Sequence, residues 1–316
     1  MKINAMRNKR NSVRLRNRKL AEVRRNWQLY VLLIAPSTWL IIFRYLPMSG
    51  LAMAFEDYSI RKGVFGSEFV GFKYFEMFFN APNFKTIFFN TITLSLYALV
   101  AGFPIPIILA LALNECKNAR VKKFIQTVTF APYFVSVVVL IAIFSQVFHE
   151  QFGIVNIFLK SIGVEPINIL GKASSFQHLY VWSGVWQSAG YSAILYIAAL
   201  SSIDSELKEA ATIDGASRFQ KIWHIDIPGI MPTIIITLIL SFGSIMSVGF
   251  EKVLIMQTPA NLSVSEIIST YVYKIGIEGV QYSYAAAIGA FNSTINFVFI
   301  VVFNRICKKV GETSLW

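Results

Sequence analysis

The chain has 316 residues, of which 55% are hydrophobic and 15% are charged, and its formal net charge is +12. Soluble domains carry about 25% charged residues, so this composition excludes an ordinary soluble enzyme and favours a protein that spans a membrane. Ten of the 29 Lys and Arg residues lie between Lys2 and Arg25. Such a basic tail favours retention on the cytoplasmic side and attraction to anionic lipids, and it argues against nucleic-acid binding.

Six apolar segments are long enough to cross a bilayer as helices, because about 20 residues cover its hydrocarbon core. In chain order they are residues 28–47, 91–114, 125–148, 179–203, 227–250 and 280–304. The first segment is full-length and lacks a small-residue cleavage site, so we expect it to remain as a span. Pro132 predicts a kink in the third segment. The predicted fold is an all-α integral membrane protein with six transmembrane helices.

Basic residues indicate which side of the membrane each loop faces, since cytoplasmic segments are enriched in Lys and Arg. With the N-terminus inside, the inner segments hold 20 Lys and Arg residues and the outer segments hold eight. We therefore predict that both termini are cytoplasmic. Cys116 and Cys307 are expected to be free thiols on the same reducing side.

This topology divides the chain into regions with different environments. The predicted regions are a basic cytoplasmic tail over 1–26, the first transmembrane helix and an external segment over 27–90, a core transmembrane domain over 91–306 with a cytoplasmic loop at 204–228, and a C-terminal cytoplasmic tail over 307–316.

The loop between the fourth and fifth segments is the most polar stretch after the N-terminal tail. Good helix formers precede Gly215, a residue that can end a helix or allow a tight turn. After it, Phe219, Ile222 and Trp223 recur at helical spacing. The loop is therefore predicted to form a short helix, a glycine turn and a second short helix.

The first of these helices carries Ala210 and Ala211 beside Glu209. Two small residues next to an acid make a narrow knob that can enter a groove on another protein, where the carboxylate can pair with a cation. The alternative is an ordinary cytoplasmic loop whose helix lies along the membrane. The chemistry of these residues leaves both interpretations open.

The same loop resembles the EAA signature of bacterial ABC importer permeases, which are inner-membrane components of binding-protein-dependent transport systems. The matching positions are Glu209, Ala210, Ala211, Gly215, Ile225 and Pro228, with Ile227 where the family usually has leucine. Asp214 before the glycine and Ala216 after it resemble the residues found at these positions in the sugar and oligosaccharide branch of the family. That branch includes the maltose-type and complex-polysaccharide permeases. The resemblance covers about residues 91–304 and implies the type I ABC importer permease fold.

The resemblance implies that Glu209, Ala210, Ala211, Asp214 and Gly215 couple the permease to a dimeric cytoplasmic ATPase. It also implies a second permease subunit, expected to be a different chain, an external solute-binding lipoprotein or periplasmic protein, and a multi-pass location in the bacterial cell membrane. The chain has no G-x-x-x-x-G-K-[ST] motif, so ATP and Mg would be used by the partner ATPase. Its three histidines lack metal-ligand spacing, and we expect it to bind no cofactor or metal and to have no catalytic residue.

Polar residues within the spans are candidates for a substrate path, because they usually face the interior of a helix bundle. Gln187, Ser188 and Tyr191 share one helical face in the fourth segment. Aromatic rings stack on sugars while amides and hydroxyls bond sugar hydroxyl groups. The alternative is packing between helices or at the membrane interface. The family resemblance favours the path and extends it to Ser244 and Ser247 in the fifth segment.

Asn292 and Asn296 lie four residues apart on one face of the last segment, where they either line the path or join helices by hydrogen bonds. The predicted function is import of a carbohydrate, most simply an oligosaccharide. The alternatives are a permease for a non-sugar solute, a secondary transporter and a membrane-embedded enzyme. The last two usually need intramembrane ionisable groups, and the six segments contain no Asp or Glu.

Overall fold

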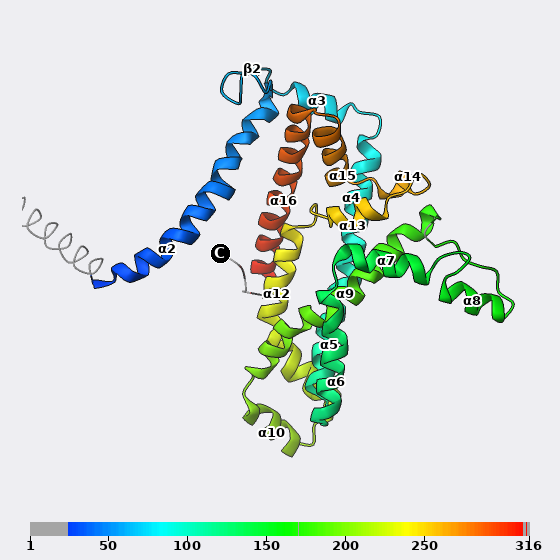
Figure 1. The fold of residues 1–316 in the computed structure, drawn as a ribbon. Coiled ribbons are helices and arrows are strands. Elements are labelled where there is room, and N and C mark those ends of the chain that lie inside the picture. Colours follow the sequence, from blue (N-terminus) through cyan, green and yellow to red (C-terminus); the bar gives the residue numbers. More distant parts are fainter. Residues whose placement is uncertain (1–24, 170, 312–313, 315–316) are drawn as a thin grey trace, which may run out of the picture. The chain divides into compact units, whose positions relative to one another are not determined.

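The computed structural model describes residues 25–169, 171–311 and 314. By internal contacts the chain divides into two compact units, residues 1–70 and 71–316 (Figure 1). Most of the predicted N-terminal tail and the last residues of the C-terminal tail lie outside the described residues.

The first unit contains one long helical run and a two-stranded hairpin. Its elements are α2 (Trp27–Leu40), the π-turn η1 (Ile41–Tyr45), the 3-10 helix η2 (Leu46–Phe55), β1 (Glu56–Asp57) and β2 (Glu68–Phe69). The strands are antiparallel, with Glu56 opposite Phe69. The run continues past Pro47, where the sequence predicted its end, because a proline early in η2 has no N–H that needs a partner.

The second unit is a bundle built from helices of very different lengths. In chain order these are α3 (Lys73–Phe79), α4 (Phe84–Gly102), α5 (Pro104–Asn114), α6 (Ala119–Phe130), η3 (Ala131–Phe134), α7 (Val137–Val147), α8 (Ile154–Ser161), α9 (Ala173–Ser201), α10 (Ser205–Ile213), α11 (Arg218–Lys221), η4 (Ile222–Asp226), α12 (Ile227–Gly243), α13 (Phe250–Met256), α14 (Leu262–Ser265), α15 (Ile268–Tyr273), η5 (Lys274–Glu278) and α16 (Tyr282–Gly311).

Helix α9 is the centre of this bundle, since it packs against α4, α5, α6 and α12, while α12 also packs against α16. Small residues permit the close crossings. A side chain at Gly190 on α9 would place its Cβ 2.0 Å from the Thr129 carbonyl oxygen on α6. Figure 1 shows α10 at one end of the bundle and α3 at the opposite end.

Four helical runs are long and apolar enough to cross a membrane: Trp27–Phe55, Phe84–Asn114, Arg218–Gly243 and Tyr282–Lys309. The bent pair Ala119–Phe134 and Val137–Val147 makes a fifth if it is counted as one span. Helix α9 has 29 residues but is not among these runs. Its serines, glutamines and aromatic residues lower its mean hydropathy. That α9 also crosses the membrane, which would make six spans in all, stays a prediction.

The third predicted span, residues 125–148, is broken instead of kinked. Its two helical parts meet at an angle of 104°. Pro132 lies in η3, and Ser136 has an extended backbone with φ −63° and ψ 153°. The Ser136 hydroxyl accepts a hydrogen bond from the Val139 N–H at 3.4 Å, which makes it the N-cap of α7. The chain thus stops one helix and starts another inside the predicted segment.

Candidate functional site

The polar loop forms the predicted helix, glycine turn and helix. Asp204 caps the start of α10 by accepting a hydrogen bond from the Glu206 N–H at 3.0 Å. At the other end Gly215 has φ +79°, and the Ala216 N–H donates to the Ala211 carbonyl at 2.9 Å. This pair of features is a Schellman motif, which needs a left-handed residue and therefore favours glycine.

The second helix of the loop is the first turn of a longer run, not a separate element. Ser217 and Gln220 form a capping box that starts α11, which continues through η4 into α12. The Lys221 ammonium donates to the Thr212 hydroxyl at 3.2 Å and so joins the two sides of the turn. Pro228 lies in the first turn of α12 and therefore inside the continuous run Arg218–Gly243.

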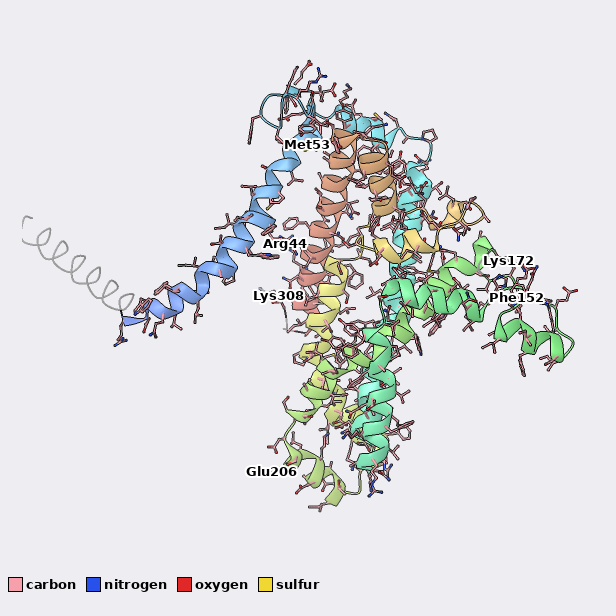
Figure 2. The ribbon with its side chains drawn as sticks, viewed as in Figure 1. Arg44, Met53, Phe152, Lys172, Glu206 and Lys308 are labelled. Carbon is pink, nitrogen blue, oxygen red and sulfur yellow. The ribbon has the colours of Figure 1, made fainter. Side chains whose placement is uncertain are left out.

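The residues of the EAA-like motif lie together on α10 and its turn. Glu209, Ala210, Asp214 and Gly215 are exposed, and Ala211 is half-buried. Two large apolar side chains beside them are also uncovered, with Ile213 86% and Phe219 84% exposed. Glu206, on the same helix, marks this end of the unit in Figure 2. The loop therefore presents acidic and apolar groups side by side on its outer surface.

A buried carboxylate lies directly behind this surface. Asp226, at the end of η4, is 1% exposed and lies 2.7 Å from the Lys208 ammonium on α10. Asp226 is the variable position between Ile225 and Ile227 of the EAA-like motif, and it is not among the residues predicted to couple. An acidic residue placed immediately before a long apolar helix is the signal that points to it.

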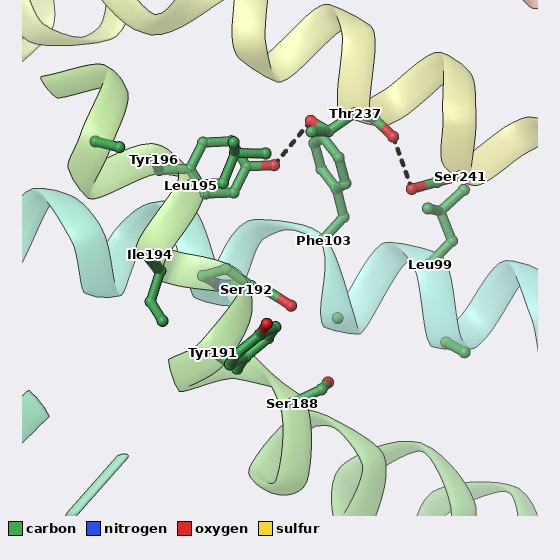
Figure 3. Close-up of a pocket in the computed structure, with 14 residues that line it drawn as sticks. Leu99, Phe103, Ser188, Tyr191, Ser192, Ile194, Leu195, Tyr196, Thr237 and Ser241 are labelled. Atoms are coloured by element: carbon green, nitrogen blue, oxygen red, sulfur yellow. Dashed lines mark hydrogen bonds between the residues drawn. The ribbon is translucent and has the colours of Figure 1, made fainter. Parts of the chain in front are cut away.

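Two of the cavities in the second unit adjoin each other, and the larger of these two has a volume of about 680 Å³ and is lined by α4, α5, α9 and α12 (Figure 3). Ser188 and Tyr191 belong to its wall. The Tyr196 and Thr237 hydroxyls are hydrogen-bonded at 2.9 Å across it. Tyr133 stacks on the Tyr191 ring with centroids 3.8 Å apart, which covers one face of that ring.

The smaller cavity has a volume of about 230 Å³ and shares Ala98, Leu99 and Ser241 with the larger one. Its wall includes Ser244 and Ser247. The sequence placed both serines within the fifth span, but α12 ends at Gly243 and they lie in the turn that follows. They reach the cavity from irregular backbone rather than from a helix face.

The other three candidate residues line neither cavity. The Gln187 amide donates to the Val135 carbonyl at 2.8 Å. The Asn296 side chain accepts from the Met246 N–H at 2.9 Å and donates to the Ser247 hydroxyl at 3.0 Å. The Asn292 amide oxygen is buried and has no hydrogen-bond partner among the described residues.

A buried lysine lies beside α9, and the predicted topology includes it only among the eight cations of the outer segments. Lys252 on α13 is 7% exposed, and its ammonium donates to the Tyr180 carbonyl at 2.8 Å and lies 4.8 Å from the centre of the Tyr180 ring. Burial lowers the pKa of Lys252 to about 8. A Cβ at Gly184 would lie 3.1 Å from the ammonium, so this glycine leaves room for it.

Candidate metal ligands do not cluster in the described part of the chain, where no group of three or more His, Cys, Asp or Glu residues could hold an ion. The candidate site consists of two adjoining cavities, whose mainly apolar walls carry serine, threonine and tyrosine hydroxyls, and of an exposed helical loop at one end of the second unit. These features define a helical membrane protein with an exposed acidic and apolar loop.

The comparisons with known proteins identify the family. Residues 102–312 match the family described as the binding-protein-dependent transport system inner membrane component, and the chain belongs to that family. It is 41% identical to Protein LplB of Bacillus subtilis (strain 168), with 94% of this chain and 93% of that protein covered. It is 37% identical to the polygalacturonan/rhamnogalacturonan transport system permease protein YteP of the same organism, with 95% and 94% covered.

A solved structure is similar over nearly the whole fold. It is the crystal structure of a bacterial alginate ABC transporter in complex with an alginate pentasaccharide-bound periplasmic protein. The likeness has a TM-score of 0.86 at 35% sequence identity, and it covers 93% of this chain and 99% of that chain.

Proposed function

We propose that this chain is the translocation subunit of an ATP-driven importer of carbohydrates, in particular oligosaccharides. The observation that carries the proposal is the exposed α10–Gly215–α11 loop on a chain whose fold is similar, almost end to end, to that of an ABC importer permease. Relatives named for transport of polygalacturonan, rhamnogalacturonan and alginate support a carbohydrate as the cargo.

In this proposal the chain crosses the bacterial cell membrane six times, with both termini in the cytoplasm. Helix α9 is the fourth of these six spans in chain order, and it is long enough to cross because 29 residues extend about 44 Å at 1.5 Å per residue. Ser188, Tyr191, Ser192 and Tyr196 face the larger cavity, and Gln187 bonds the Val135 carbonyl, so these polar groups of α9 need not meet lipid.

The α10 loop docks into a groove on a dimeric cytoplasmic ATPase, which binds and hydrolyses ATP with Mg. Glu209 pairs with a cation of that groove, while Ala210 and Ala211 let α10 approach closely and Asp214 and Gly215 shape its end. Ile213 and Phe219 are covered on docking, because large exposed apolar side chains are typical of surfaces that bury a partner.

The two cavities form this chain's share of the substrate path, with Ser188, Tyr191, Ser244 and Ser247 as hydroxyl groups that meet the sugar. Gln187 and Asn296 hold neighbouring backbone by hydrogen bonds, and Asn292 lines neither cavity. A second permease subunit, of a different sequence, completes the path, and an external solute-binding protein delivers the cargo. The family membership and the periplasmic protein in the alginate transporter complex support these partners.

The proposal is tested by purifying the chain with its ATPase and second permease and measuring uptake into vesicles. Probes are short oligogalacturonates and neutral oligosaccharides, offered with the solute-binding protein. We expect ATP-dependent uptake that persists when proton and sodium gradients are collapsed. Glu209→Ala should weaken ATPase association and uptake, whereas Glu206→Ala, an exposed acid on the same helix, should change neither. Gradient-driven uptake without ATP would contradict the proposal and favour a secondary transporter.

A further inference from the structure

Asp226 is the only carboxylic acid in the buried class within the described part of the chain. It ends the π-turn η4 and directly precedes α12. A buried carboxylate is costly unless it is paired with a cation and hydrogen-bonded, so a strong constraint fixes its surroundings. Single π-turns inside helical runs are also frequent at functional positions.

Three helices meet at this carboxylate. The Lys208 ammonium on α10 lies 2.7 Å from one oxygen, and the Asn114 amide at the end of α5 donates to the other at 3.5 Å. The backbone of Asp226 leads straight into α12. Both α5 and α12 contribute to the wall of the larger cavity, through Pro106 and Thr237 among others. The ion pair thus connects the exposed helix with two walls of the cavity.

Apart from its chain connections, no comparable anchor of α10 is found among the described residues. None of its residues is buried. The Lys221–Thr212 hydrogen bond is exposed, and such contacts contribute little because water competes for the same groups. The Lys208 side chain is 28% exposed and its carboxylate partner 1%. The placement of α10 against α5 and α12 therefore depends on the Lys208–Asp226 pair and on the turn at Gly215.

We propose that Asp226 is a positioning residue, which transmits displacements of α10 to α5 and α12 through its ion pair with Lys208. The inference rests on the proposed function, in which α10 docks into a partner ATPase, and it takes that ATPase to displace α10 during its ATP cycle. If α10 shifts, the pair either carries the cytoplasmic ends of α5 and α12 with it or breaks and leaves the buried carboxylate unpaired. Because breaking is the costlier course, the cavity walls follow the loop.

The test uses the assembled transporter and a reporter of access to the larger cavity. Cys116→Ser and Cys307→Ser remove the free cysteines of the described chain, and Ser192→Cys places one thiol on the cavity wall. Its reaction with a small cationic methanethiosulfonate reagent is timed without nucleotide and after trapping with ATP, Mg and vanadate. In this background we expect trapping to change the rate by about tenfold, which is within the usual range of coupling between sites.

Asp226→Asn keeps the shape of the side chain but removes its charge. With this change the ATPase should still co-purify and hydrolyse ATP, whereas the effect of trapping on thiol reactivity should fall below about twofold. Lys208→Met should act in the same way. The double variant should be no worse than either single one, because both changes remove the same interaction. Lys208→Arg retains the charge and should retain the response.

Lys221→Met is the matched control, since it removes the exposed hydrogen bond between the two sides of the turn. In this variant trapping should change the thiol reactivity as much as in the transporter with Lys208 and Asp226 intact. An undiminished response in Asp226→Asn would overturn the proposal. Failure of both Asp226→Asn and Lys208→Met to assemble would also overturn it, because the pair would then serve folding and not transmission. If the transporter with the pair intact shows no nucleotide response and Glu209→Ala leaves ATPase association unchanged, the proposed function fails and the inference fails with it.

Discussion

The backbone of Gly215 determines where α10 ends. Its φ of +79° lies in the left-handed region, and the Schellman hydrogen bonds around it require that conformation. A Cβ at this position would meet no neighbouring atom, so the cost of a substitution comes from the backbone alone. For an L-residue this cost is about 1–2 kcal/mol.

Gly215→Ala should therefore weaken ATPase binding by about tenfold, because the strained turn loosens the end of α10 and 1.4 kcal/mol corresponds to that factor. The measurement is the affinity of the ATPase for the reconstituted permease pair. Gly63→Ala is the control, since Gly63 has φ +69° and also has no atom within 4 Å of its Cβ position, but lies between β1 and β2. Equal losses in both variants would contradict the interpretation.

Lys252 is expected to make stability depend on pH. In the unfolded chain this lysine keeps its proton up to about its ordinary pKa of 10.5, whereas burial lowers the folded pKa to about 8. Between these values the unfolded state binds more protons, so the free energy of unfolding rises with pH. The full cost of the buried charge is present below about pH 8 and amounts to roughly 3 kcal/mol.

The melting temperature of the purified protein should therefore increase from pH 8 to pH 10, and this increase should be smaller in Lys252→Met. Lys274→Met is the control, because it removes a partly exposed lysine whose ammonium lies 3.1 Å from the Glu266 carboxylate. It should keep the pH response of the unchanged protein. Identical pH profiles for Lys252→Met and the unchanged protein would refute the assignment.

The helices and the turn of the α10 loop could be predicted from the sequence because the signals for them are local. Helix formers before Gly215 predict a helix and a turn, and apolar residues at helical spacing after it predict a second helix. Asp226 and Lys252 could not be evaluated in the same way, since their burial depends on partners 18 and 72 residues away, Lys208 and Tyr180. Nothing in a single sequence gives those distances.

The close crossing of α9 and α6 depends on a glycine, Gly190, at the point of contact. At Gly190 an added Cβ would lie 2.0 Å from the Thr129 carbonyl oxygen, which belongs to backbone and cannot rotate away. Gly190→Ala should therefore force α9 and α6 apart and destabilise the protein by about 1–3 kcal/mol, the usual effect of overpacking. The measurement is the melting temperature of the detergent-purified chain.

Gly102→Ala is a matched control for this crossing, because its Cβ would meet Val185 of the same helix α9 at 3.7 Å, an ordinary contact distance. Alanine also has the higher helix propensity, so this change should be neutral or slightly stabilising. A melting temperature lowered equally by both substitutions would show that close approach at Gly190 is not the cause.

Predictions about elements succeeded where apolar runs were continuous and failed where capping residues interrupted them. The helical runs Phe84–Asn114 and Tyr282–Lys309 extend the predicted second and last spans. The break at Ser136 and the turn after Gly243 are specified by hydrogen bonds at helix ends, which hydropathy does not register. For this reason Ser244 and Ser247 were predicted to lie within the fifth span, although they lie in the turn that follows α12.

For the whole molecule, the predicted topology can be tested with its own thiols. Cys116 follows α5 and Cys307 lies in the last turns of α16, and both side chains are partly exposed. With both positions in the cytoplasm, a membrane-impermeant maleimide should label them in inside-out vesicles and not in right-side-out vesicles. Mass spectrometry of the labelled peptides measures the outcome.

Lys160→Cys supplies the opposite control, since Lys160 is exposed on α8 in a segment that the topology places outside. This thiol should react in right-side-out vesicles. Labelling of Cys116 and Lys160→Cys from the same side would contradict the predicted number of crossings between them.

The modest hydropathy of α9 has a consequence for how the protein is made. A nascent helix leaves the translocon for lipid according to its own apolarity, and the serines and glutamines of α9 make that step less favourable than for the runs on either side. Its neighbours α4, α5 and α6 are synthesised first and pack against it in the finished bundle. We therefore expect α9 to enter the bilayer efficiently only when these earlier helices are already present, so that the order of synthesis is also an order of assembly.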